Sequence, residues 1–310
     1  YDIASDTQME KFRRAYRAGV YNVDVLFNNE TPMIINEFMP RKMIWNFVPA
    51  TSAPFLDKNE REPLLVQRWS SRVIMYNGAK HATAPINNLW DLTKPEWKGK
   101  VLLPSVLESS VMANALQTIL QYPEAMGEAY QQAFGQPVTF SEPLLRITKR
   151  NIALAPADAA KEWLFRMIRN CVFIESTDKI YANIADVTQA QPPIGVTTFS
   201  KLRDNKPGVA DARAAYDVKP AFGVAYPTVL IIADRAPHPN AAKLLIRYMM
   251  EEGYVPWNEP GDYAARSDFV KKQVAEFNIP SFDDLKLWKL DPVHVYDTRY
   301  SFVELFLGLR

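Results

Sequence analysis

Two strand-to-helix junctions in the sequence carry polar side chains that suit the binding of an anion. Their residues are Asn29, Glu30 and Thr31 after the apolar segment 23–27, and Ser109 and Ser110 after the segment 100–104. A helix start offers free backbone N–H groups and the positive end of the helix dipole, and hydroxyl groups add donors. Because ligands of open α/β sheets bind beyond the carboxyl ends of strands, the junctions predict a carboxylate or phosphate site. Ser and Thr are also ordinary helix caps, so simple capping is the alternative.

A second group of residues is expected to complete this site: Trp69, Ser70, Thr197, Thr198 and Tyr226. Neutral donors suit a phosphate, phosphonate or carboxylate, because several aligned N–H and O–H groups stabilise negative charge without a permanent counter-ion. Trp69 either forms an apolar wall for the ligand or fills a domain junction. Tyr226 either contacts the ligand or packs at a hinge.

Catalytic and metal-binding signatures are missing from the sequence. It contains no Walker loop, no Gly-x-Gly-x-x-Gly, no Gly-x-Ser-x-Gly and no His-Glu-x-x-His motif. Its three histidines lie far apart, without cysteine or carboxylate partners at ligand spacing. We therefore expect no catalytic residue, no metal site and no cofactor. The rival hypothesis, a two-domain transferase, would have to use Lys201, Glu108 or His81, and none of these has a partner in the sequence.

The composition is that of a globular protein, with 48% hydrophobic and 23% charged residues. Lys and Arg number 36 against 35 Asp and Glu, so no basic field is available for nucleic acid. We expect a monomer whose ligand is a small molecule. No apolar run approaches the roughly 20 residues of a membrane span. The single cysteine, Cys171, lies in an apolar run, where a buried structural thiol is expected.

Strand-like and helix-like segments alternate along the chain, which predicts an α/β protein with parallel sheets covered by helices. The predicted strands are 23–27, 72–76, 100–104, 171–174, 194–198 and 226–233. The predicted helices are 5–19 with Ser5 or Asp6 as cap, a short helix capped by Thr31, one from Ser110, then 123–134, 143–150, 156–170, 239–251 and much of the tail beyond Asp262. The helices predicted over 123–134, 143–150 and 156–170 each carry proline in the first turn.

Three stretches together resemble the iron-type family of bacterial extracellular solute-binding proteins, which also includes binders of thiamine, phosphonates and sugar phosphates. They are LWDLTKPEWKGKV at 89–101, APHPNAAKLL at 236–245 and RVIMYN at 72–77. The resemblance implies a type II periplasmic-binding-protein fold, with two lobes joined by hinge crossovers near 69–73 and 225–230. Lobe 1 would hold 1–70 and 230–310, and lobe 2 would hold 71–229. It also implies that the fold's first strand and helix precede Tyr1 and are missing from this chain.

The chain departs from the ferric-binding members of this family at one position. Those members carry adjacent tyrosines after the strand that corresponds to 194–196, whereas this sequence has Thr197, Thr198 and Phe199. Threonine hydroxyls do not supply the anionic oxygens that ferric iron prefers. The family's acidic ligand aligns with Asn29 or Glu30, which leaves that position open.

The resemblance therefore implies the solute-binding subunit of an ABC importer, in the periplasm or lipid-anchored outside the cell. Its partner would be a membrane permease, and its ligand a small anionic organic molecule bound in a cleft between the lobes. Ferric-ion binding is the alternative.

Overall fold

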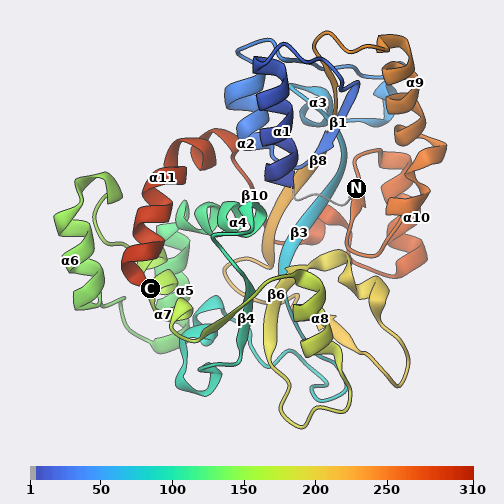
Figure 1. Cartoon of the computed structure of the whole chain (residues 1–310). Coiled ribbons are helices and arrows are strands. Elements are labelled where there is room, and N and C mark those ends of the chain that lie inside the picture. Colours follow the sequence, from blue (N-terminus) through green and yellow to red (C-terminus); the bar gives the residue numbers. More distant parts are fainter. Residues whose placement is uncertain (1–4) are drawn as a thin grey trace. The chain divides into compact units, whose positions relative to one another are not determined.

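The computed structural model describes the backbone of residues 5–310 and the side chains from Thr7 onward (Figure 1). The chain divides into two compact units. Unit 1 comprises the residues up to Ser71, together with Tyr226–Asp284 and Asp291–Tyr296. Unit 2 comprises Arg72–Ala225, Leu285–Leu290 and Asp297–Arg310. The expected caps Ser5 and Asp6 lie outside the described side chains, and the segment expected before Tyr1 lies outside the described residues.

The strands are β1 (Val25–Asn28), β2 (Ile44–Trp45), β3 (Leu65–Asn77), β4 (Val101–Pro104), β5 (Cys171–Ile174), β6 (Ile194–Thr198), β7 (Ala212–Ala214), β8 (Gly223–Ala233), β9 (Tyr263–Ala264) and β10 (Leu287–Lys289). The α-helices are α1 (Ser5–Arg17), α2 (Thr31–Met33), α3 (Lys58–Arg61), α4 (Ser110–Leu120), α5 (Pro123–Phe134), α6 (Glu142–Arg150), α7 (Ala159–Ile168), α8 (Thr177–Ala185), α9 (Pro239–Met250), α10 (Ser267–Phe277) and α11 (Pro292–Leu309). A π-helical turn covers Ile34–Phe38, and short 3-10 helices cover Ala53–Phe55, Leu89–Thr93, Pro95–Trp97, Ile152–Leu154, Phe199–Asp204, Glu252–Trp257 and Phe282–Asp284.

Unit 1 is built on the second part of β8 and the first part of β3. Strands β1 and β2 both pair antiparallel with β8, with Asn28 opposite Val229, and β9 pairs antiparallel with β3. Helices α1 and α9 bury Met9 and Ile246 in the same apolar core as Leu230. The prediction of parallel sheets is therefore wrong for this unit, because its short strands run antiparallel to β8 and β3.

Unit 2 has a parallel centre, in which β4 lies between β5 and β6. Strand β6 also pairs antiparallel with β3, so this sheet is mixed. Helix α8 lies against one face at Gly195, where an added Cβ would approach Ile180 to 2.7 Å. Glycine at this position permits the close approach of helix and strand.

The end of the chain divides differently from the sequence expectation, which placed all of 230–310 with lobe 1. Strand β10 pairs in parallel with the first part of β8, which belongs to unit 2. Most of α11 buries Phe302, Leu305 and Phe306 in the core of unit 2. Apolar burial and strand pairing thus outweigh sequence order here. The unit boundaries fall after Ser71 and Ala225, inside β3 and β8.

Local sequence signals define many of the elements, and α5, β5 and β6 have the predicted bounds. Two predicted helix starts are wrong. Thr31 is the first residue of α2 and not its cap, since the loop is closed by Asn28 Oδ1, which accepts from the Glu30 N–H at 2.8 Å. Helix α7 starts after Asp158, whose carboxylate accepts from the Lys161 N–H at 2.9 Å, so Pro156 lies outside the helix.

Among the helices of residues 5–310, none combines the length and the apolar character that a bilayer crossing requires.

Candidate functional site

The polar end of the unit 2 sheet centres on Arg72 and Thr198. These residues lie directly opposite each other on β3 and β6, and the Arg72 Nη1 donates a hydrogen bond to the Thr198 Oγ1. Directly opposed residues of an antiparallel pair project to the same face of the sheet. The arrangement places a permanent cation beside a neutral hydroxyl at the carboxyl end of β6. Such a pair suits a carboxylate or phosphate, because the guanidinium has several donors in one plane.

The predicted residues Thr197 and Thr198 lie on opposite faces of the sheet, as strand alternation requires. Thr197 is fully buried on the face covered by α8, and its hydroxyl lies 3.4 Å from the Thr177 carbonyl oxygen, which accepts from it. Thr198 is half-buried on the other face, beside Arg72. Only Thr198 of the two therefore shares a face with the guanidinium.

Ser109 and Ser110 lie at the start of α4, after the carboxyl end of β4. The Ser109 Oγ accepts from the Met112 N–H at 3.3 Å, which makes Ser109 an N-cap. Because β4 and β6 are parallel, their carboxyl ends meet at the same edge of the unit 2 sheet. This edge gathers Ser109, Ser110, Thr198 and Arg72. Capping accounts for the Ser109 hydroxyl as an acceptor, and the Met112 and Ala113 N–H groups both donate to Ser109.

In unit 1 the loop after β1 buries polar groups that make no hydrogen bond within the described residues. These groups are the Asn29 Oδ1 and the Thr31 Oγ1, and the Ser71 Oγ on β3 is a third. Thr31 and Ser71 are 2% and 1% exposed. A buried polar atom without a partner costs about 1–3 kcal/mol, so such atoms mark places where a ligand would repay the cost. Glu30 beside them is buried as well.

Trp69 and Ser70 point to opposite faces of β3, again because side chains alternate along a strand. The Trp69 ring packs against Phe282 at 5.8 Å between centroids, and its Nε1 donates to Glu60 Oε1 at 3.4 Å. Phe282 also contacts Tyr263, which lies opposite Trp69 on β9. Within unit 1 the Trp69 ring is thus part of an aromatic cluster, whereas Ser70 lies on the face of Arg68.

Arg68 is a unit 1 residue that the sequence reasoning missed. Its guanidinium lies over the rings of Phe27 and Trp257, at 5.2 and 5.6 Å from their centroids. Its Nε donates to Asp262 Oδ2 at 3.1 Å. The other oxygen of Asp262 is buried without a hydrogen bond in the described chain. The available signal was an arginine between the apolar run 64–66 and Trp69, since an arginine beside apolar residues seldom occurs without a specific partner.

The residues proposed for a rival enzyme are not assembled into catalytic geometry. The Lys201 ammonium pairs with Asp178 and Asp204, both of which are carboxylates on the same unit. Glu108 is exposed, and His81 lies 6.4 Å from the Tyr76 ring. Tyr226, the last predicted contact residue, is 6% exposed at the first position of unit 1 on β8.

The buried phenols of unit 2 keep their protons at neutral pH. Burial raises the pKa of the Tyr181 hydroxyl to about 12, helped by the negative charges of Asp204 and Asp211. Burial likewise raises the pKa of Tyr76. In residues 7–310, no three His, Cys, Asp or Glu side chains gather in a way that could hold a metal ion.

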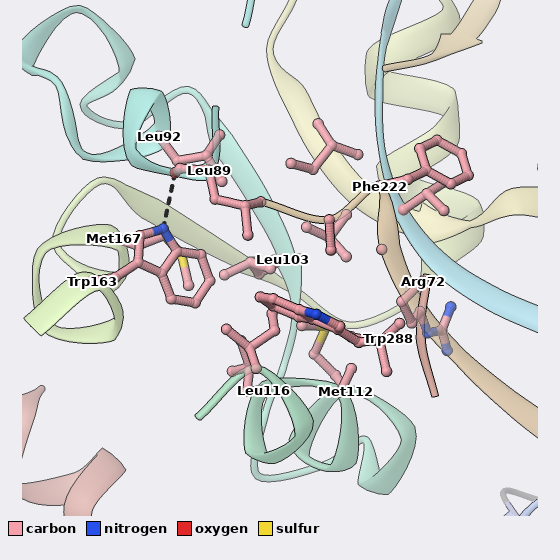
Figure 2. A pocket seen from close by; sticks show the side chains of 18 residues that line it. Arg72, Leu89, Leu92, Leu103, Met112, Leu116, Trp163, Met167, Phe222 and Trp288 are labelled. Atoms are coloured by element: carbon pink, nitrogen blue, oxygen red, sulfur yellow. Dashed lines mark hydrogen bonds between the residues drawn. The ribbon is translucent and has the colours of Figure 1, made fainter. Parts of the chain in front are cut away.

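An apolar cavity of about 40 Å³ lies inside unit 2, between α4 and the sheet (Figure 2). Its walls are Arg72, Val73, Ile74, Leu89, Leu92, Leu103, Met112, Ala115, Leu116, Ile119, Trp163, Met167, Val196, Ala221, Phe222, Gly223, Val224 and Trp288. Arg72 is the charged side chain among them, and Figure 2 shows it at one side of the cavity. The Trp163 Nε1 donates to the Leu89 carbonyl oxygen at 2.9 Å, which fixes the ring as a wall.

Comparison with known proteins gives matches among solved structures. No family model matches the sequence, and no curated protein does. Iron-bound HitA from Pseudomonas aeruginosa has a TM-score of 0.65 and 15% identity, covering 97% of this chain and 87% of that chain. A putative spermidine/putrescine ABC transporter from Listeria monocytogenes has a TM-score of 0.60 and 15% identity, covering 99% and 88%. Trichodesmium IdiA (FutA), in complex with iron and citrate ligands, has a TM-score of 0.59 and 14% identity, covering 99% and 89%.

These similarities establish the fold class. The chain has a mixed α/β structure with an open sheet, which matches the two-lobe fold of periplasmic binding proteins. The expected type II periplasmic-binding-protein fold is thereby confirmed. At 14–15% identity, the similarity carries the fold and not the ligand.

Proposed function

We propose that this chain is the solute-binding subunit of an ABC importer and that it captures a small anionic organic molecule without chemical conversion. It would act in the periplasm, or lipid-anchored outside the cell, and deliver its ligand to a membrane permease. The fold supports this class of protein, since structures of similar fold include an ABC transporter component. The predicted contact residues Ser109, Ser110 and Thr198 of unit 2 would bind its charged group.

The Arg72–Thr198 pair is the observation that carries the choice of an anion. The guanidinium donates a hydrogen bond to a neutral hydroxyl, and its planar array of donors matches the oxygens of an anion. The start of α4 lies at the same edge of the sheet and adds the positive end of its helix dipole. In unit 1, the buried oxygens of Thr31 and Ser71 offer hydroxyl donors that the described chain leaves unused. Within unit 2, the charge of Arg72 and the helix dipole of α4 suit a carboxylate, phosphonate or phosphate ester.

The proposal is tested by titrating the purified protein with inorganic phosphate and with acetate, followed by calorimetry. The variant Arg72→Gln should weaken binding at least tenfold, because a charged hydrogen-bonding group contributes about 1.5–3 kcal/mol. Arg213→Gln is the matched control. It removes the same charge from β7, next to β3, where Arg213 pairs with Asp211. Equal affinities for the wild-type protein and Arg72→Gln would contradict the proposal.

Ferric-ion capture is the second candidate, because two of the structures with the same fold are iron-bound. It predicts a visible absorption band when the protein is mixed with ferric citrate. The anionic-ligand proposal predicts no such band, since Thr197 and Thr198 supply no anionic oxygen. Turnover of a phosphorylated compound, lost in Lys201→Ala, would instead indicate a transferase.

A further inference from the structure

The apolar cavity of unit 2 adjoins the polar edge of the sheet that carries Arg72 and Thr198. Arg72 lines the cavity and also bonds to Thr198. Met112 lines it from the first turn of α4, and its backbone N–H bonds to the cap Ser109. Val196 lines it from β6, two residues before Thr198 and on the same face of the sheet. The polar edge and the apolar cavity therefore share α4, β3 and β6.

The chemistry of the walls limits what the cavity can hold. Aliphatic, aromatic and thioether side chains make up its surface, with Arg72 at one side (Figure 2). Walls of this kind offer water few of the two to four polar partners that it needs. A volume of about 40 Å³ is well below the roughly 150 Å³ cavity that accepts benzene, so an aromatic ring or a long chain does not fit.

We propose that this cavity is the subsite for a short branched aliphatic tail on the anionic ligand, whose charged head lies at Arg72. The inference rests on the proposed function, since the head must first bind at the polar edge. The proposed ligand is therefore a small carboxylate or phosphorylated compound with an isopropyl-sized end. Trp163 and Trp288 act as walls that exclude larger or longer chains.

Packing around the cavity favours a preformed subsite. Trp288 stacks on Tyr122 with centroids 4.3 Å apart and planes within 3°, which holds its ring in place. Trp163 is 2% exposed and held by its bond to Leu89. Phe222 is 1% exposed and contacts Phe199 and Tyr216. Rigid walls lower the entropy lost on binding, and they do not move aside for a ligand group that is too large.

Methyl NMR can test the subsite, because two of its walls are methionines. The protein is labelled with 13C at the methionine methyl groups and titrated with acetate and with isovalerate, which is acetate carrying an isopropyl group. Met112 and Met167 line the cavity, and substitution by leucine assigns their signals. Met126 is buried in the same core, does not line the cavity and serves as the internal control.

Isovalerate should shift the Met112 and Met167 signals saturably, leave Met126 unchanged and bind about tenfold more tightly than acetate. Each buried methylene contributes about 0.8 kcal/mol, or about fourfold in affinity, so the gain corresponds to part of the isopropyl group. Ala115→Val adds two methyl groups to a wall and should abolish the difference between the two acids. Leu116→Val enlarges the cavity and should favour 4-methylpentanoate over isovalerate.

Equal affinity for the two acids would overturn the subsite and leave the anion site standing. Unmoved Met112 and Met167 signals during saturation with isovalerate would overturn it as well. If Ala115→Val raises stability and isovalerate binding stays at the wild-type value, the cavity is a packing void only. If neither acid nor inorganic phosphate binds at all, the subsite and the proposed anion-binding function both fail.

Discussion

Arg72 and Thr198 lie directly opposite each other on β3 and β6, and the guanidinium of one donates a hydrogen bond to the hydroxyl of the other. The pair lies at the carboxyl end of β6, at the sheet edge where α4 also starts. Arg72 is in addition a wall of the apolar cavity. One residue thus joins a polar edge that suits an anion to an apolar space that suits a short tail.

The hydroxyl of Thr198 is expected to act as a positioning group for Arg72. Thr198→Val keeps the shape of the side chain and removes the acceptor, so the guanidinium loses its fixed direction. We expect about a tenfold loss of affinity for phosphate and a change in the free energy of unfolding below about 1 kcal/mol. Calorimetric titration together with urea unfolding measures both. Wild-type affinity in this variant would show that Arg72 needs no such support.

The buried hydroxyls of Thr31 and Ser71 in unit 1 are expected to lower the stability of the ligand-free protein and to strengthen the binding of a ligand. Thr31→Val and Ser71→Ala each remove an oxygen that is buried without a partner in the described chain. Each should raise the free energy of unfolding of the ligand-free protein by about 1 kcal/mol, because the desolvation cost disappears. The same variants should bind the ligand less tightly.

Thr118→Val is the matched control for these two variants. Its hydroxyl is equally buried, but it donates to the Asn114 carbonyl oxygen at 2.9 Å. This variant should lose about 1 kcal/mol of stability, since it breaks a bond that is made. If Thr31→Val and Ser71→Ala destabilise the protein as Thr118→Val does, the two hydroxyls are bonded in solution and are not held for a ligand.

Glu162 should be among the most sensitive positions of unit 2. Its buried carboxylate accepts from the Ser141 N–H at 2.8 Å, from the Ser141 hydroxyl at 2.5 Å and from the Arg166 Nε at 2.7 Å. Glu162→Gln leaves the cation of Arg166 without its carboxylate partner, at an expected cost of about 3 kcal/mol in denaturant unfolding. Glu162→Gln combined with Arg166→Met should recover part of that loss. Additive losses in the double variant would contradict the pairing.

Asp234 should make unit 1 sensitive to acid. The indole N–H of Trp45 donates to its carboxylate at 2.9 Å and the Tyr16 hydroxyl at 2.8 Å. The bond from Trp45, partly opposed by burial and then helped by Tyr16 and Arg235, holds the pKa of Asp234 below its usual value. Because the folded pKa is depressed, this stability is present above the unfolded pKa of about 3.9 and is lost as the pH falls through the folded value.

Unfolding of the wild-type protein and Asp234→Asn from pH 7 to pH 3 measures this effect. The wild-type protein should be the more stable of the two at pH 7, and the difference should shrink as the solution becomes acidic. A difference that stays constant over this range would show that the charge of Asp234 does not contribute.

The sequence predicted those elements whose signals are local. Helix α5 starts at Pro123 and ends before Gly135, which has a φ of 70°, and strand β6 is a short run of mostly β-branched residues. The first half of β3 was missed, because its polar side chains do not alternate with apolar ones and its pairing with β9 joins residues almost 200 positions apart. Arg72 was also missed as a site residue. Its position opposite Thr198 depends on the register of two distant strands, which residue types alone do not determine.

Native mass spectrometry of the purified protein tests the central claim most directly, because it detects a small molecule that stays bound during purification. The proposal predicts one anionic organic molecule per chain, released on unfolding and retained less well by Arg72→Gln. A tightly held iron ion in place of such a molecule would contradict it.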